Sequence, residues 1–136
     1  MTHALAPLLA GAALLTGALS AQAADYPTKP IRLVVPFTPG AGTDTVARFV
    51  AQKLSERMGQ QVVVENRGGA GSTIGTGIAA KAAPDGYTYL VTSPAHAINA
   101  TLYRKLPYDT EKAFVPVTQL VSSPLVLYAN TRLPAG

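Results

Sequence analysis

Three short loops carry the groups that could do chemistry in this sequence. They are 38–42, 67–71 and 93–95, each follows an apolar run, and together they are rich in Gly, Ala, Ser and Pro. Such residues let backbone N–H groups approach a ligand, and a following helix adds about half a positive charge at its N-terminus. A small carboxylate suits such loops. The residues leave a second interpretation equally open, in which the glycines serve loop geometry alone.

Few side chains in or near these loops can ionise. Asp44 is the only acid, and it suits the N-cap or the first turn of a helix. It could at the same time accept a hydrogen bond from a ligand or orient bound waters. Arg67 either pairs with a ligand carboxylate or is a surface charge beside Glu65. His96 follows the third loop, and a lone histidine cannot build a metal site. We therefore predict no metal centre and no catalytic residue.

Composition narrows the class of protein further. The chain has no cysteine, which excludes disulfides, thiolate metal ligands and a cysteine nucleophile. Its formal net charge of +4 suits anionic ligands. The bases are scattered singly from Lys29 to Arg132 without an interleaved aromatic platform, which argues against nucleic acid as a partner.

An enzyme is the main alternative that the second loop raises. Gly69 to Gly75 follows an apolar run, as a dinucleotide-binding loop does, but it reads G-x-G-x-x-x-G, one residue longer than that fingerprint. The sequence has no phosphate-binding loop of the Walker type, and Ser72 does not stand in G-x-S-x-G. We predict a protein that is not an enzyme and needs no cofactor.

The first residues have the pattern of a secretory signal peptide. An Ala-, Leu- and Gly-rich run from Ala4 to Ser20 ends in Ala21-Gln22-Ala23, although no Lys or Arg precedes it. The run is shorter than the roughly 20 residues that span a bilayer. We predict that residues 1–23 are removed after Ala23, that residues 24–136 form one small domain, and that the protein is periplasmic.

The elements that must position the loops follow from periodicity. Residues 31–37 and 61–65 are predicted strands, and residues 87–92 are a third. Amphipathic helices are predicted from Thr43 to Met58, from Ser72 to Ala82 and from His96 towards Tyr103. We expect Thr43 or Asp44 to cap the first helix, Gly59 to end it and Ser72 to cap the second. This βα repetition predicts an α/β fold with a parallel sheet, followed by extended segments at 115–121 and 125–129.

Several ordered motifs together resemble the Bug family of extracytoplasmic solute-binding receptors, which serve tripartite tricarboxylate transporters. The motifs are Tyr26–Phe37, Pro39–Asp44, Val63–Arg67 with Gly69–Gly71, Pro84–Thr88, His96–Asn99 and Leu106–Asp109. Ala41 and Gly68 depart from the family pattern, in which glycine and proline respectively are common.

The resemblance implies a two-lobed binding protein of the type II periplasmic class. It implies a cofactor-free monomer that captures a small organic acid and delivers it to the membrane components of a transporter. Ligand-binding positions carried over from the family come from all three loops. They are Phe37, Gly40, Ala41, Gly42, Thr43, Asp44, Gly71, Ser72, Ser93, Pro94, Ala95 and His96.

Family members are more than twice as long as this chain. We therefore expect residues 24–136 to be the first lobe, with the second lobe missing and the chain ending near the crossover, where Leu125–Asn130 resembles the crossing strand. Two other hypotheses stay open: a truncated gene product without function, and a one-lobe interaction protein that binds no solute.

Overall fold

The computed structural model describes residues 26–124, 126–130 and 132. The predicted signal peptide and its cleavage site lie outside the described residues. The elements are listed here in chain order. They are β1 (Ile31–Val35), α1 (Gly42–Met58), β2 (Val62–Asn66), the 3-10 turn η1 (Ala70–Ser72), α2 (Thr73–Ala80), β3 (Thr88–Leu90) and α3 (Ala95–Leu102).

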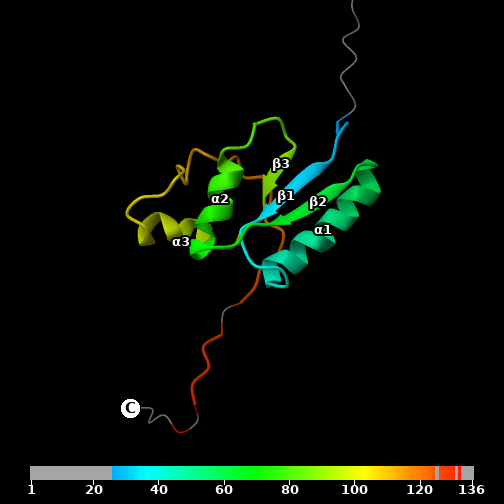
Figure 1. The fold of residues 1–136 in the computed structure, drawn as a ribbon. Helices are drawn as coiled ribbons and strands as arrows, with labels where there is room; N and C mark the ends of the chain where they lie inside the picture. The colour runs from blue at the N-terminus through cyan, green and yellow to red at the C-terminus, as the bar shows by residue number, and fades with distance from the viewer. Residues whose placement is uncertain (1–25, 125, 131, 133–136) are drawn as a thin grey trace, which may run out of the picture.

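The three strands form one parallel sheet in the order β2-β1-β3 (Figure 1). Ile31 pairs with Val62 on one side of β1, and Arg32 pairs with Thr88 on the other. Strand β1 is therefore central, and the connection from β2 to β3 passes over it to reach the opposite edge of the sheet. Right-handed crossovers then place α1 and α2 on opposite faces of the sheet, as Figure 1 shows. The predicted α/β class is confirmed.

The core lies on both faces of β1. On the α1 side, Ile31 and Leu33 pack with Ala51 of the helix and Val62 of β2. On the α2 side, Val34 is fully buried. A strand buried on both faces reads as a continuous apolar run, which is why this segment was recognisable as a central strand.

Helix α2 approaches the sheet through small residues instead of large ones. Its buried residues are Thr73, Gly75, Thr76, Gly77 and Ala79. Ile74 and Ile78, two of the apolar positions on which the helix was predicted, are exposed to 52% and 39%. A Cβ on Gly75 would lie 2.4 Å from the carbonyl oxygen of Arg67 and 2.8 Å from Cα of Pro36. The helix therefore touches the backbone that follows both β1 and β2.

Strand boundaries differ modestly from the predictions. Strand β1 ends at Val35 because Pro36 has no N–H to donate to the ladder. Strand β3 is only the three residues Thr88–Leu90. Gly59 ends α1 as predicted, in the left-handed conformation with its N–H bonded to the carbonyl of Ser55.

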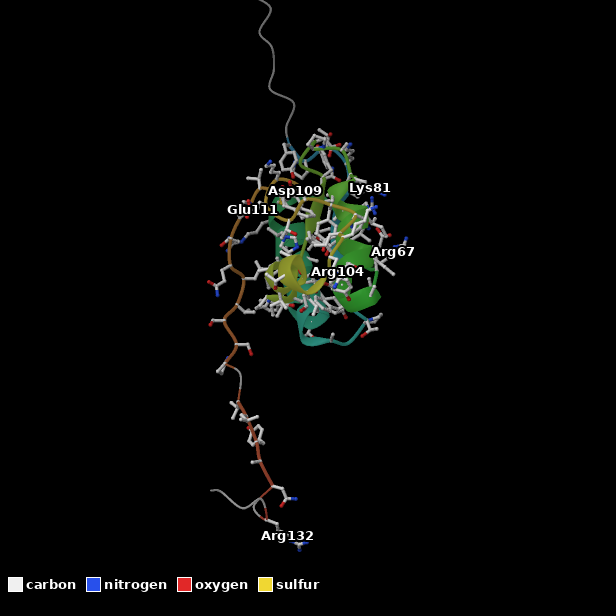
Figure 2. All side chains as sticks on the ribbon, turned by 90° about the vertical axis from the view of Figure 1, so that its left-hand side faces the viewer. Arg67, Lys81, Arg104, Asp109, Glu111 and Arg132 are labelled. Carbon is white, nitrogen blue, oxygen red and sulfur yellow. The ribbon has the colours of Figure 1, made fainter. Side chains whose placement is uncertain are left out.

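The segment after residue 114 forms no strand among its described residues. Val115, Val117 and Leu127 are exposed to 88%, 75% and 96%. Figure 2 shows this segment leaving the folded part, with Arg132 far from Glu111. No described residue of the segments predicted to be extended, 115–121 and 125–129, pairs with a neighbouring strand. None of the described helices has the length and apolar character needed to cross a bilayer.

Candidate functional site

The three loops that the sequence singled out meet at one edge of the sheet. All three strands are parallel, so their carboxyl ends lie together. In a sheet of order 2-1-3, ligands bind at this edge, near the point between β1 and β3 where the chain reverses its direction of winding. Their bounds in the structure differ by a few residues from the predicted ones: we call residues 36–41 loop one, residues 69–72 loop two and residues 91–94 loop three.

Loop one is built around the buried carboxylate of Asp44, which is 2% exposed. Its Oδ2 accepts hydrogen bonds from the Gly40 N–H at 2.8 Å and from Arg48 Nε at 3.0 Å. Its Oδ1 accepts a hydrogen bond from Asn66 Nδ2 at 2.9 Å. Loop one is thus fixed to α1 by a single ionised side chain.

Asn66 joins this network to the end of β2. Its Nδ2 also donates to the carbonyl oxygen of Phe37 at 3.2 Å, and its Oδ1 accepts from Arg48 Nη2 at 2.9 Å. The four residues Phe37, Asp44, Arg48 and Asn66 therefore form one connected set, here called the Asp44 network. It couples two strand ends to the first turns of α1.

The prediction that Thr43 or Asp44 caps α1 is wrong. The N-cap is Ala41, and no side chain caps the helix. Asp44 lies inside the first turn, where it reaches back to the loop instead of to the helix N–H groups. Hydrogen bonds from the Gly40 N–H, then from Arg48 and Asn66, lower the pKa of Asp44 from 3.8 to about 2. The carboxylate is ionised over the physiological range.

Donors remain at the N-terminus of α1. The first N–H bonded back to the chain in helical fashion is that of Thr45, which donates to the carbonyl of Ala41 at 3.0 Å. Among the described residues, none accepts a hydrogen bond from the N–H of Gly42 or Thr43. These two donors, at the positive end of a helix of 17 residues, are suited to a carboxylate.

Loop two has an unusual backbone. Its four residues all have positive φ, and two of them, Ala70 and Ser72, are not glycine. Ser72 is 3% exposed and occupies the N-cap position of α2, but its side chain does not cap that helix. Its hydroxyl instead accepts a hydrogen bond from Asn99 Nδ2 at 3.2 Å. The predicted side-chain cap is therefore wrong, while Gly71 lies exposed at the loop surface.

Loop three leads into α3 with a local hydrogen bond. The N–H of Ala95 donates to Ser93 Oγ at 3.3 Å, and Pro94 is the N-cap. His96 lies in α3, where its ring stacks on Tyr108 with centroids 5.9 Å apart and meets Phe114 edge-on. These contacts anchor the ring to the segment after α3, and Nε2 lies 3.3 Å from the carbonyl oxygen of Thr110.

Arg67 is engaged by the protein itself. Glu65 Oε1 accepts from Arg67 Nε at 2.6 Å, and Glu65 Oε2 accepts from Arg32 Nη2 at 2.6 Å. The Arg32 and Arg67 hydrogen bonds lower the pKa of Glu65. This triad supports the interpretation of Arg67 as a paired surface charge.

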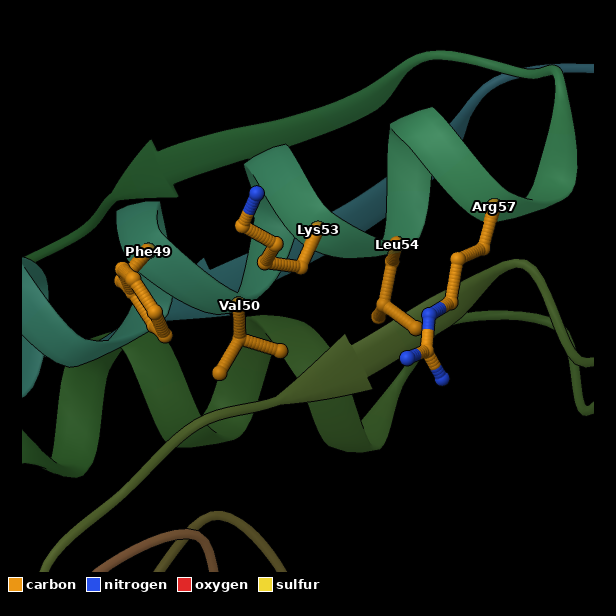
Figure 3. A pocket seen from close by; sticks show the side chains of 5 residues that line it. All are labelled: Phe49, Val50, Lys53, Leu54 and Arg57. Carbon is orange, nitrogen blue, oxygen red and sulfur yellow. The ribbon is translucent and has the colours of Figure 1, made fainter.

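Elsewhere, a shallow apolar groove runs along α1 (Figure 3). Its lining residues are Phe49, Val50, Lys53, Leu54 and Arg57. None of the predicted ligand-binding residues lines it. Across the described part of the chain, no three His, Asp or Glu residues come together as a metal site would require.

Four residues that organise the loops were not among the predicted site residues: Arg48, Asn66, Asn99 and Tyr103. Arg48 lies four residues after Asp44, the spacing of a helical ion pair, so that signal was available. Asn66 stands at the carboxyl end of a predicted strand, which also marks it. Nothing in the spacing of Asn99 or Tyr103 indicates that α3 folds back onto loop two.

The fold is shared with solved binding proteins. The structure matches the periplasmic binding protein BugD with a TM-score of 0.63 at 44% identity, covering 65% of this chain and 30% of that one. It matches MatC from Rhodopseudomonas palustris, solved with bound malate, with a TM-score of 0.63 at 40% identity, over 68% and 32% of the two chains. An R. palustris protein with adipate matches with a TM-score of 0.61 at 45% identity, over 63% and 29%. The class is thus that of solute-binding proteins.

Sequence relatives identify the family. Residues 46–136 match the tripartite tricarboxylate transporter family receptor, and the chain belongs to that family. BugT of Bordetella pertussis is 45% identical over 114 residues, which are 82% of this chain and 35% of BugT. A protein from the tcbD-tcbE intergenic region of Pseudomonas sp. strain P51 is 44% identical over 123 residues, covering 88% and 37%. This chain therefore spans little more than a third of these relatives.

The solved structures and the sequence relatives both confirm the predicted resemblance to the Bug family of solute receptors. The family consists of solute receptors, which sets the enzyme hypothesis aside.

Proposed function

We propose that this chain is the first lobe of a periplasmic receptor that captures a small organic acid for a tripartite tricarboxylate-type transporter. The observation that carries the proposal is its similarity, at 40% and 45% identity, to proteins solved with malate and with adipate. Residues 1–23 are its signal peptide, and residues 24–136 supply one wall of the binding cleft. The receptor acts as a monomer and delivers its solute to the membrane components of the transporter.

The ligand carboxylate binds at the carboxyl edge of the sheet. The free N–H groups of Gly42 and Thr43 receive one carboxylate oxygen, with the helix α1 dipole behind them. Phe37, Gly40 and Ala41 shape the approach from loop one. Gly71 and Ser72 from loop two, and the stretch from Ser93 to His96, form the remaining rim.

Asp44 acts on the ligand indirectly. Its carboxylate already accepts three hydrogen bonds from protein donors and is almost wholly buried. A carboxylate ligand would also be repelled by a second bare carboxylate at contact distance. We assign Asp44 the role of holding the Gly40 N–H and the first turn of α1 in the geometry that receives the anion.

The proposal is tested by the intact mass and ligand content of the protein recovered from its native periplasm. Cleavage after Ala23 and release of a di- or tricarboxylic acid on denaturation are expected. A protein that keeps residues 1–23, or one that carries no carboxylic acid and binds neither malate nor adipate by calorimetry, would contradict it. A native mass matching residues 24–136 alone would favour a one-lobe interaction protein, because a half-cleft cannot exclude water from a ligand.

A further inference from the structure

Loop two holds four consecutive residues in a backbone region that most residues avoid. The φ angles of Gly69, Ala70, Gly71 and Ser72 are 130°, 46°, 61° and 79°. Glycine accepts such angles without cost, but a Cβ at Ala70 or Ser72 approaches the neighbouring carbonyl. Two strained residues separated by a single glycine persist only where the surroundings over-determine them. Some other part of the molecule must therefore hold this loop.

Helix α3 and its C-cap residue supply the contacts that hold it. Asn99 is 3% exposed, and its Nδ2 donates to the carbonyl oxygen of Gly71 at 2.7 Å and to Ser72 Oγ at 3.2 Å. One turn later, the hydroxyl of Tyr103 donates to the carbonyl oxygen of Ala70 at 3.1 Å. Two side chains on one face of the α3 segment thus fix consecutive carbonyl groups of loop two.

The hydrogen bonds inside loop two and α2 cannot replace these contacts. Thr73 Oγ1 donates to the Ala70 carbonyl at 2.9 Å, and Thr76 Oγ1 donates to the Ser72 carbonyl at 2.9 Å. Both connect residues only three or four apart, so they would move with the loop. Among the described residues, only Asn99 and Tyr103 bond loop two to an element distant in sequence. Of the two, Asn99 is the one shielded from water that could take its place.

We propose that Asn99 is a positioning residue whose side-chain amide locks loop two into its left-handed backbone. Its connection to the ligand rests on the proposed function, because loop two forms part of the rim of the cleft. Asn99 acts as a donor, so an acceptor-only side chain of the same shape cannot substitute for it.

The first experiment measures the loop backbone directly in this chain. Coupling constants that report φ are recorded by NMR for Ala70 and Ser72 in the wild type, in Asn99→Asp and in Asn99→Ala. The exposed neighbour Ile98 supplies the matched control, Ile98→Ala, on the same helix. Positive φ is expected in the wild type and the control, with a shift towards negative φ in both Asn99 variants. Left-handed couplings that persist in Asn99→Ala would overturn the proposal.

A second variant separates positioning from general stability. Ala70→Gly removes the cost of a left-handed residue, so in the Asn99→Ala background it should restore the loop backbone at least in part. A ¹H–¹⁵N spectrum of the double variant reports both folding and loop position. A double variant that remains unfolded, or whose loop is unrestored, would make Asn99 an ordinary core residue and overturn the proposal.

The effect on ligand is measured by calorimetry with malate and adipate. In a receptor that binds either acid, Asn99→Ala should weaken the affinity about tenfold, and Ala70→Gly should recover part of that loss. Additive losses in the double variant would argue against positioning. If the receptor recovered from its native periplasm binds neither acid, the proposed function fails, while the couplings still decide the role of Asn99.

Discussion

Loop one and loop two stand at the same edge of the sheet but are held by different chemistry. Loop one depends on an ionised carboxylate, because Asp44 gathers Gly40, Arg48 and Asn66 around it. Loop two depends on neutral donors, the amide of Asn99 and the hydroxyl of Tyr103, acting on strained backbone. We therefore expect loop one to respond to pH and loop two to respond to substitutions that change its backbone. The proposed ligand-binding edge of the sheet can therefore be perturbed in two independent ways.

The largest loss of stability is expected at Gly75, which packs against the backbone that follows both β1 and β2. Gly75→Ala places a Cβ 2.4 Å from the Arg67 carbonyl oxygen and 2.8 Å from Pro36, and these backbone atoms cannot move without shifting α2 from the sheet. We expect a loss of about 1–3 kcal/mol or more of unfolding free energy, measured by urea denaturation. Gly42→Ala is the control, because its Cβ would meet nothing within 4 Å. Equal stability of the two variants would refute this packing.

The next largest loss of stability is expected when the Asp44 network is disrupted. Asp44→Asn leaves Arg48 and the Gly40 N–H without an ionised acceptor, so the variant should be less stable near neutral pH. Because folding lowers the pKa of Asp44 from 3.8 to about 2, its stabilising contribution is complete above pH 3.8 and disappears as the pH falls through about 2. Urea midpoints of wild type and variant should converge over that interval. A gap that stays constant down to pH 2 would show that ionisation is unimportant.

Loss of a hydrogen bond in loop two should lower the stability by less, and by an amount that does not depend on pH. Tyr103→Phe removes the hydroxyl that donates to the Ala70 carbonyl at 3.1 Å, and Ala70 is exposed, so water can take its place in part. A loss of about 0.5–1.5 kcal/mol is expected from one neutral hydrogen bond. The same urea series should show this loss unchanged between pH 6 and pH 2. A loss that varies with pH as that of Asp44→Asn does would erase the distinction between the loops.

The smallest effect is expected from Ala70→Gly alone. The substitution relieves a left-handed alanine but adds conformational freedom to the unfolded chain, and the two terms oppose each other. The net change in unfolding free energy should stay within about 1 kcal/mol of zero. The control is Ala100→Gly in the middle of α3, which carries only the helix penalty of about 1 kcal/mol. A larger loss at residue 70 than at residue 100 would mean that Ala70 is not strained.

The helices and strands could be predicted from periodic patterns in the sequence, whereas the contacts between residues distant in sequence could not. Strand β1 and helix α1 follow from apolar periodicity, and Gly59 from its role as a helix stop, so these were correct to within a residue or two. Ile74 and Ile78 were recognised as helical, but only the close approach of Gly75 to Pro36 decides that they face outward. Asp44 was recognised as important, yet its partner Asn66 lies 22 positions away. The hydrogen bonds from Asn99 to loop two could not be predicted, because no local pattern in the sequence indicates where α3 lies.

The order β2-β1-β3 also has a consequence for how the chain reaches this structure. Every backbone pair in the sheet joins residues distant in sequence, such as Ile31 with Val62 and Arg32 with Thr88. Neither crossover offers a hairpin that could form first, so the entropy of closing long loops must be lost before any strand pair is gained. Refolding should therefore be slow compared with that of a helical bundle of equal size. During that delay, the apolar central strand remains open to other chains.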